Sequence, residues 1–439
     1  MAWVSPTRGL TWEASAINGL PCYLDLPEKG TIEGSVSVCI PSLPRCLSLA
    51  ITPAFEIQEA GVDLLVLDEV EQSLRSLGGD HLSDWQAKAA YHSVIGHIHA
   101  AKNVVAMDAD AGVLTQEIFR LAGKELTVVE GPAPAPRDAL VFASRAEWLA
   151  RVIELATKGK RLVLPVHSVE EAEVLARTVP AYQGMPTAVL SRETVSKFDM
   201  SNINSELLRH GHLIYTPLIG TGVSITLKDH FDHVCPLLSN SIGTASDAMQ
   251  FVNRVRHPRH RGLLIGSLGG GRSPAPWESD PEQVLRVLFA REEATLQRIG
   301  FIRQLPAELA VLHDGHRVLN PDSLAYCKFL ALVHAEKVLD GEGRVIKAFL
   351  ERLEANGGKI YEYRTEKPTV GAKAASKARK AEKEVVVEER VQEIVAAPIP
   401  EASKVEEIKR RGPKSKNEAN ILRKAGIEAF YGEGTGSDE

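Results

Sequence analysis

The stretch Leu64-Leu65-Val66-Leu67-Asp68-Glu69-Val70-Glu71-Gln72 runs from an unbroken apolar segment into acidic residues. An apolar run of this length is typical of a buried strand in a parallel sheet. Such a strand fixes its last residues at the sheet edge, where Asp68 can hold Mg²⁺ through water and Glu69 can orient an attacking water. A strand end with solvated acids gives the same pattern, so the pair alone leaves both interpretations open.

Apolar runs alternate with helical periodicity on both sides of this stretch, which predicts an α/β fold with parallel sheets. The proline-rich stretch Gly131–Pro136 interrupts the alternation and predicts a hinge between two lobes. Ser168 and Glu171 have the spacing of a capping box that opens a helix over Val169–Ala176. The other expected elements are strands at Val36–Ile40, Val62–Leu67, Val104–Met107, Arg161–Val166, Leu213–Thr216 and Gly262–Ile265, and a helix at Ala87–Ala101.

Beyond Gly271 the pattern changes to helical spacing, with helices expected at Pro281–Ile299, Ser323–Leu339 and Val345–Glu354. From about Thr365 lysine, glutamate and alanine dominate and apolar periodicity fades, which indicates a disordered, flexible charged tail. The sequence therefore predicts a first lobe over residues 1–130, a second over 137–272, a helical C-terminal domain over 276–364 and the tail over 365–439.

Composition excludes several classes of protein. A formal net charge of -6 means that nucleic-acid contacts would need local basic patches. The five cysteines lack CxxC spacing, which argues against a zinc ribbon or a disulfide framework and favours a reducing cytoplasm. No stretch approaches the ~18 apolar residues of a membrane span, so no membrane partner is expected.

Two further motifs carry chemistry. Gly220-Thr221-Gly222 follows a predicted strand, and glycines there let backbone amides approach an anion closely. Gln250 and Arg254 lie one helical turn apart, so an amide and a guanidinium can point together at a nucleotide. An ordinary strand-to-helix turn and a solvated basic helix end are the alternatives. The order of the three motifs along the chain favours the functional interpretation.

The ordered set resembles the motifs of superfamily 2-type DNA helicases, especially the origin-binding and cyanobacterial plasmid replication proteins of the RepA-like family. The resemblance covers about Met1 to Gly271. The matching motifs are Ia (Ser5–Arg8), Ib (Ser35–Leu43), II (Asp68-Glu69), III (Asp108–Asp110), IV (Leu162–His167), V (Thr216–Ile225) and VI (Gln250–Arg256).

The resemblance implies two RecA-like lobes that close around ATP and Mg²⁺. It implies Asp68 for Mg²⁺, Glu69 as the hydrolytic base, and Arg254 or Arg256 as the arginine that stabilises the transferring phosphoryl group. The nucleotide site would also include Gln250, Gly220, Gly222, Asp108 and Asp110. Single-stranded or origin DNA would meet Thr7, Arg8, Ser42 and Thr221, which suit phosphate contacts without sequence readout.

One departure from the family is serious, because no GxxxxGK[ST] phosphate loop occurs in the 439 residues. The first lobe is therefore expected to be incomplete. The expected function is the helicase module of a plasmid- or phage-type replication protein, truncated or split, which needs a polypeptide bearing the phosphate loop or other replication proteins as partners. Whether the chain is an enzyme by itself stays open. The alternative is a non-catalytic DNA-binding accessory protein that retains the helicase scaffold.

Overall fold

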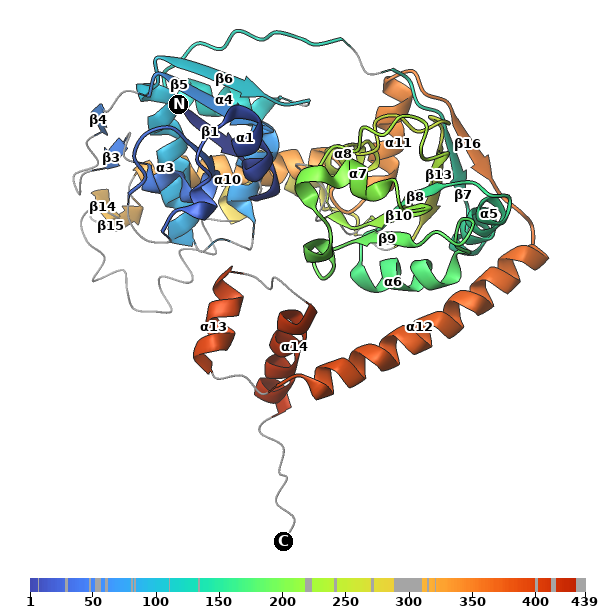
Figure 1. The fold of residues 1–439 in the computed structure, drawn as a ribbon. Coiled ribbons are helices and arrows are strands. Elements are labelled where there is room, and N and C mark those ends of the chain that lie inside the picture. Colours follow the sequence, from blue (N-terminus) through green and yellow to red (C-terminus); the bar gives the residue numbers. More distant parts are fainter. Residues whose placement is uncertain are drawn as a thin grey trace. The chain divides into compact units, whose positions relative to one another are not determined.

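The computed structural model describes the 439-residue chain except for positions 7, 28–30, 47–48, 52–56, 60–61, 80–81, 83, 110, 133–134, 218–222, 241–242, 270–271, 288–309, 314–315, 320, 399–401, 412–415 and 432–439. The chain forms two compact units (Figure 1). Unit 1 comprises Met1–Pro132, Thr244–Ser246 and Arg272–Val345, and unit 2 comprises Ala133–Gly243, Asp247–Gly271 and Ile346–Glu439. The first division between them falls inside the proline-rich stretch.

Unit 1 is built on a four-stranded parallel sheet with the order β2-β1-β5-β6. Its strands are β1 (Ala2–Ser5), β2 (Val36–Cys39), β5 (Leu64–Asp68) and β6 (Asn103–Met107), with two hairpins formed by β3 (Leu49–Ile51) with β4 (Ile57–Glu59) and by β14 (Ala310–His313) with β15 (His316–Leu319). Its helices are α1 (Arg8–Asn18), α2 (Val70–Arg75), α3 (Asp84–Ala100), α4 (Val113–Leu121) and α10 (Pro321–Leu339), with short 3-10 turns at Tyr23–Asp25, Ile40–Arg45, Ser76–Gly78 and Pro276–Ser279.

The core of unit 1 includes side chains from α10, far along the chain. The Tyr91 ring on α3 lies 5.2 Å from the ring of Tyr326 and 5.1 Å from that of Phe329. Val333 joins the same buried cluster. The prediction of a separate helical domain over 276–364 is therefore wrong, because the apolar stripe of α10 is buried against the first lobe.

Unit 2 contains a larger sheet, with the order β16-β7-β13-β11-β8-β10-β9 and β12 paired to β13. All these pairs are parallel. The strands are β7 (Ala139–Phe142), β8 (Leu162–Pro165), β9 (Thr187–Leu190), β10 (His212–Tyr215), β11 (His233–Val234), β12 (Leu237–Leu238), β13 (Leu263–Ser267) and β16 (Ile360–Tyr363). The helices are α5 (Arg145–Thr157), α6 (Val169–Thr178), α7 (Ile203–Leu207), α8 (Ala245–Val252), α11 (Val345–Ala355), α12 (Val370–Ala396), α13 (Ala402–Arg411) and α14 (Lys416–Tyr431), with 3-10 turns at Val195–Lys197 and Met200–Asn202; α8 and α11 each begin with residues of unit 1.

The α/β class and the parallel sheets predicted from the sequence are confirmed, and each expected strand is present to within a few residues. The capping box is partly confirmed, because the Ser168 hydroxyl accepts a hydrogen bond from the Glu171 amide at 3.0 Å at the start of α6. The expected helix Pro281–Ile299 lies partly outside the described residues.

The prediction of a flexible tail is wrong for Val370–Ala396. These residues form the long helix α12, which packs along α5 and α6 (Figure 1). Ala372, Ala375 and Val386 are buried in this contact. The charged side chains of α12 pair with acids fixed on α6, including Arg390 with Glu173 at 3.0 Å and Lys383 with Glu170 at 3.0 Å. Composition gave no sign of order because the partners lie about 200 residues away in the sequence.

Glu171 is the most buried acid of this contact. Its carboxylate binds Arg145 on α5 and accepts hydrogen bonds from Arg379 on α12 at 3.2 and 2.8 Å. Burial alone raises the pKa of Glu171, but the two guanidinium groups outweigh burial and hold that pKa below its ordinary value. The ionised carboxylate therefore stabilises the fold above the ordinary carboxyl pKa, and this contribution is lost as pH falls.

We predict that Glu171→Gln lowers the free energy of unfolding of the chain by about 3 kcal/mol at pH 7, because it leaves two half-buried guanidinium groups without a counter-charge. Urea denaturation followed by circular dichroism measures this. The matched control is Glu384→Gln, since the pair of Glu384 with Lys380 is exposed. The control should change the free energy by less than ~0.5 kcal/mol. Equal effects of the two substitutions would contradict the stabilising role of the Glu171 carboxylate.

Candidate functional site

Three predicted acidic residues meet at the carboxyl edge of the unit 1 sheet. Asp68 is the last residue of β5 and lies opposite Met107 of β6, so Asp108 follows directly on the neighbouring strand. Glu69 is half-buried and adopts a left-handed conformation, with φ 49°, at the start of α2. A non-glycine residue in this conformation is strained, and such strain often marks a functional position.

The electrostatic environment of Asp68 disfavours a bare negative charge. Burial raises the pKa of its carboxyl group, and the neighbouring Asp108 carboxylate raises it further. The Glu69 amide opposes this shift only in part. A divalent cation beside Asp68 would remove the penalty, because it replaces the missing positive charge.

Asp108 and Glu71 brace two helices at this edge. The Asp108 carboxylate accepts a hydrogen bond from the Glu71 amide at 2.8 Å, in the first turn of α2. The buried Glu71 carboxylate in turn accepts hydrogen bonds from the amides of Gly112 (2.5 Å) and Thr115 (3.0 Å) at the start of α4. These amides are donors that a helix leaves unsatisfied. Sequence reasoning gave Glu71 no role, although an acid in the first turn of a helix is a usable signal.

In unit 2 the end of motif V and motif VI lie side by side. Ile225 and Val255 form a parallel bridge, in which the Ile225 amide donates to the Arg254 carbonyl at 2.9 Å and the Arg256 amide donates to the Ile225 carbonyl at 2.9 Å. The exposed Arg256 side chain donates to the Ser224 hydroxyl at 3.2 Å. The Arg254 guanidinium lies 3.4 Å from the Gln250 amide oxygen, so the predicted contact is present. The predicted helix is too long, because α8 ends at Val252 and Arg254 lies beyond it.

The two arginines of motif VI differ in exposure. Arg254 is only 6% exposed, and its charge lowers the pKa of the buried Tyr215 phenol, which burial raises by more. The Tyr215 hydroxyl donates to the Phe251 carbonyl at 2.5 Å, and the His167 ring lies 5.3 Å from the Phe251 ring. Burial lowers the pKa of His167 to about 4, so its ring is neutral near pH 7. Motifs IV, V and VI therefore form one packed cluster within unit 2.

Arg137 is a second residue that sequence reasoning missed. It lies before β7, is 8% exposed, and donates to the Arg261 carbonyl at 2.8 Å and to the Asn253 side chain at 2.5 Å. Burial and the neighbouring Arg261 lower its pKa to about 10. These bonds anchor the end of motif VI to the first strand of the unit. The prolines in front of Arg137 predicted a hinge, and nothing in the local sequence indicated a buried arginine there.

Several predicted residues lie outside the described part of the chain. They are Thr7, Asp110, Gly220, Thr221 and Gly222. Of the other residues predicted to meet DNA, Arg8 begins α1 and Ser42 is half-buried in the 3-10 turn Ile40–Arg45.

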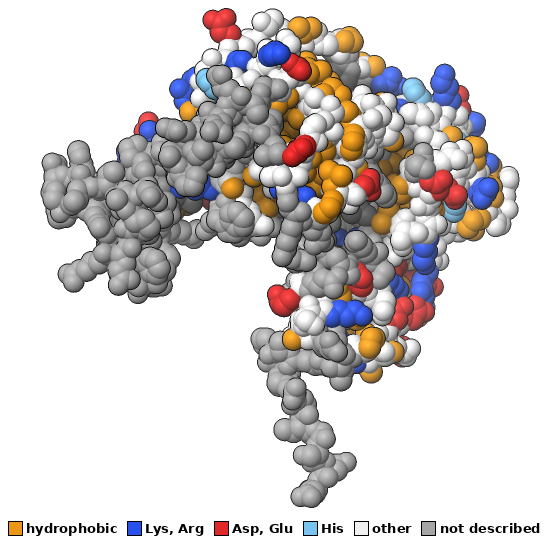
Figure 2. Space-filling view, turned by 60° about the vertical axis from the view of Figure 1, so that its left-hand side comes forward, with side chains coloured by type: hydrophobic (Ala, Val, Ile, Leu, Met, Phe, Trp, Pro, Cys, Tyr) orange, Lys and Arg blue, Asp and Glu red, His pale blue; other side chains and the backbone are white. Residues whose placement is uncertain are grey.

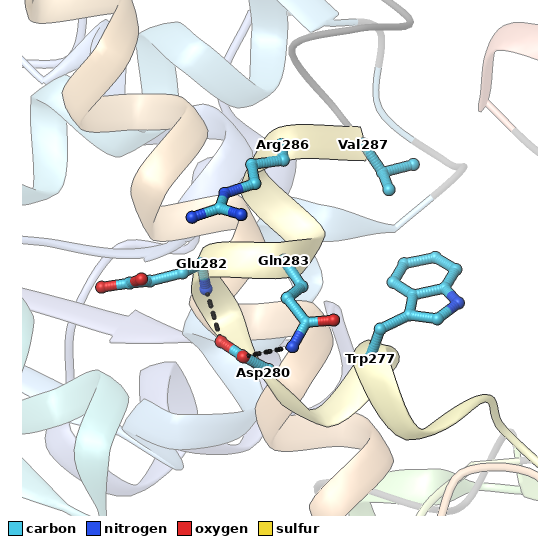
Figure 3. Close-up of a pocket in the computed structure, with 6 residues that line it drawn as sticks. All are labelled: Trp277, Asp280, Glu282, Gln283, Arg286 and Val287. Atoms are coloured by element: carbon cyan, nitrogen blue, oxygen red, sulfur yellow. Dashed lines mark hydrogen bonds between the residues drawn. The ribbon is translucent and has the colours of Figure 1, made fainter.

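A surface hollow in unit 1 involves none of the predicted residues. Trp277, Asp280, Glu282, Gln283, Arg286 and Val287 line it (Figure 3). The Asp280 carboxylate accepts hydrogen bonds from the Glu282 amide (3.0 Å) and the Gln283 side chain (2.7 Å). Its oxygens are therefore bonded to neighbouring residues of the same segment.

No three His, Cys, Asp or Glu side chains in the part of the chain that the structure describes are arranged to hold a metal ion. Within the same residues, no helix combines the length and apolar character that crossing a bilayer requires. All five cysteines are buried free thiols.

No protein-family model matches this chain. A mimivirus protein named for replication-origin binding is 22% identical over 46% of the chain and 26% of its own length. An uncharacterized Picosynechococcus protein is 24% identical over 84% of the chain and 38% of its own length. An African swine fever virus protein named as part of a helicase/primase complex is 26% identical over 46% of the chain and 20% of its own length. The chain thus spans between a fifth and two fifths of the length of these relatives.

Solved helicase structures resemble the chain only loosely. The Mycobacterium smegmatis helicase Lhr, bound to single-stranded DNA and AMP-PNP, gives a TM-score of 0.38 at 15% identity and covers 74% of this chain and 53% of its own. Cas3 of T. fusca with ADP gives 0.42 at 11% identity, covering 87% of this chain and 50% of its own. Scores of this size do not establish a shared fold.

We predict that Glu71→Gln leaves the free energy of unfolding unchanged or raised at pH 7, whereas Glu71→Ala lowers it by about 2 kcal/mol. Glutamine keeps the oxygen that accepts from Gly112 and Thr115 but removes a buried charge. Burial raises the pKa of Glu71 despite these bonds. Its stabilising contribution is therefore complete below the ordinary carboxyl pKa and declines as pH rises through the raised value.

Thermal unfolding of the three proteins between pH 4 and pH 8 measures both effects. The stability of the glutamine variant relative to the unsubstituted chain should grow as pH rises. A glutamine variant as unstable as the alanine variant would refute the capping role of Glu71.

Proposed function

We propose that this chain is the helicase module of a DNA replication protein, which couples ATP hydrolysis to movement on DNA. The observation that carries the proposal is the meeting of Asp68, Glu69 and Asp108 at the carboxyl edge of a parallel sheet. This is the edge at which α/β proteins bind ligands. The names of the viral relatives support a role in replication-origin binding or in a helicase/primase complex.

In this proposal Asp68 holds Mg²⁺ through water. Its carboxyl group fits that task, because burial and Asp108 disfavour its bare charge and oxygen ligands suit Mg²⁺. Bound with ATP, Mg²⁺ would neutralise phosphate charge. The strained turn at Glu69 would aim its carboxylate at the attacking water, while Asp108 holds the first turn of α2 in position.

The second unit would supply Gln250 and the motif VI arginines. Arg256 is the better residue to stabilise the transferring phosphoryl group, because its guanidinium is exposed whereas that of Arg254 is buried. Arg254 would position the cluster of Gln250 and Tyr215. The glycines and Thr221 of motif V, with Thr7, Arg8 and Ser42, would contact the nucleotide and the DNA backbone as the resemblance implies.

The proposal requires a phosphate loop from a segment other than these 439 residues, in the same or another polypeptide. Exposed apolar groups on β6 support this requirement. Val104 and Ala106 pack on the core, but Val105 and Met107 on the other face are 44% and 37% exposed. Strands of parallel sheets are normally covered on both faces. An apolar strand paired along β6, followed by its helix, would cover this surface.

The absence of a GxxxxGK[ST] sequence also favours a second candidate, a DNA-binding replication accessory protein that keeps the scaffold without catalysis. Both candidates predict DNA binding, but only the helicase module predicts ATP hydrolysis, so ATPase activity separates them.

We predict DNA-stimulated ATPase activity when the full chain is mixed with a strand-loop-helix polypeptide that carries GxxxxGK[ST]. Glu69→Gln should lower the rate at least ~100-fold, because it removes the group that orients the attacking water. The matched control is Glu117→Gln on α4, whose carboxylate pairs with Arg120 at the surface. Unchanged activity in Glu69→Gln would refute the assignment, and inactivity of every mixture with DNA binding intact would favour the accessory protein.

We predict that the same polypeptide slows hydrogen exchange of the β6 amides. Val105→Asp should weaken its binding at least tenfold, because a charge would be buried at the new contact. Ile17→Asp is the control, since Ile17 is 74% exposed on α1 of the same unit. Exchange that slows in α1 and not in β6 would place the contact elsewhere and contradict this pairing.

A further inference from the structure

Cationic and histidine side chains gather at the amino edge of the unit 2 sheet, where its parallel strands begin. Four segments form this amino-edge surface: 158–161 before β8, 209–211 before β10, 228–233 before and into β11, and 257–261 before β13. Together they hold seven Lys or Arg, five His and two Asp, whereas the whole chain carries a net charge of -6. This surface is therefore positively charged although the net charge of the whole chain is negative.

The four segments are bonded into one surface. The Arg161 guanidinium lies 2.9 Å from the His230 ring, whose other nitrogen lies 3.2 Å from the His210 carbonyl. The Asp229 amide donates to the His257 carbonyl at 3.1 Å, and the Arg259 amide donates to the Phe231 carbonyl at 2.9 Å. The four segments that carry the charges are thus held in fixed relative positions.

Much of this charge is open to solvent. The side chains of Lys158 and Arg259 are 62% and 56% exposed, and Arg209, Lys228 and Arg261 are exposed as well. The His233 and His260 rings stack with 4.5 Å between centroids. Lys158 pairs with Glu154 of α5 at 2.5 Å and Arg259 pairs with Asp232 at 3.2 Å, so the cations still outnumber the acids at this surface. Figure 2 shows Lys and Arg side chains on one face of the molecule, with acidic side chains beside several of them.

We propose that the amino-edge surface binds the phosphate backbone of a nucleic acid, separately from the nucleotide and DNA contacts proposed above. The segments precede β13, β11, β8 and β10, which are neighbours in that order. Three strand spacings span about 14 Å, which matches roughly four nucleotides along one strand. An open row of cations at this spacing fits an extended polyanion better than a small ligand in a cavity.

The site differs from the helicase motifs by its position in the fold. The end of motif IV (Val166–His167) and motif V follow the carboxyl ends of β8 and β10, whereas Arg161 and His210 precede the amino ends of the same strands. The proposal needs neither ATP nor a phosphate loop, so it can hold even where the proposed catalysis fails.

The test is binding of a fluorescein-labelled single-stranded oligonucleotide to the full chain without nucleotide, followed by anisotropy. The triple substitution Lys158→Gln, Arg209→Gln and Arg261→Gln should raise Kd at least tenfold and reduce the dependence of log Kd on log salt by about 2, since each lost phosphate contact removes ~0.7. The charge-preserving substitutions Lys158→Arg, Arg209→Lys and Arg261→Lys should keep the affinity within about threefold.

A control with the same loss of charge is Lys347→Gln, Arg364→Gln and Lys380→Gln, exposed cations of unit 2 outside this surface. Affinity lost equally in this control, or retained in the first triple variant, would overturn the proposal. Competition by poly-glutamate as strong as that by unlabelled oligonucleotide would overturn the assignment to nucleic acid, because it would indicate recognition of charge alone.

Discussion

The parallel pairing of β5 with β6 is the constraint on which the candidate site depends. Parallel strands in register end at the same edge, so residues 40 positions apart in sequence become neighbours at the end of the sheet. Asp68 and Asp108 are brought together in this way without any local sequence signal that connects them. The apolar residues of β5 are buried on both faces, which fixes the strand and therefore the direction of its last carboxylate.

Burial also makes this edge electrostatically costly. Burial raises the pKa of Asp68 and of Glu71, the neighbouring Asp108 raises that of Asp68 further, and the fold offsets this cost with helix amides. Asp108 and Glu71 each accept from the first turn of a helix, so α2 and α4 are oriented by the acids that flank the candidate metal position. A cation bound there would lower the electrostatic cost of these carboxylates.

The sequence predicted those parts of the molecule whose signals are local. Apolar runs located the strands, and the spacing of Ser168 and Glu171 located the start of α6. It failed where order depends on a distant partner. The sequence from Thr365 onward lacks apolar periodicity. The helix α12 forms there because Arg379 pairs with Glu171 and Ala375 packs into the core beside α5 and α6. For the site, the acidic residues at the end of β5 and the contact of Gln250 with Arg254 were predictable, but the end of α8 at Val252 was not. Glu71 and Arg137 were missed because their partners lie far away in sequence.

The two edges of the unit 2 sheet suit different ligands because side chains are buried at one edge and exposed at the other. At the carboxyl ends of β8 and β10, side chains pack inward: Tyr215 is fully buried, His167 is uncharged, and Arg254 is enclosed. At the amino ends, exposed cations stand in a row with few acids among them. An enclosed cluster favours precise contact with a single small group, whereas an open row favours a long and regularly charged chain. The burial at one edge and the exposed charge at the other therefore follow from where the connecting segments of a parallel sheet turn inward or remain open to solvent.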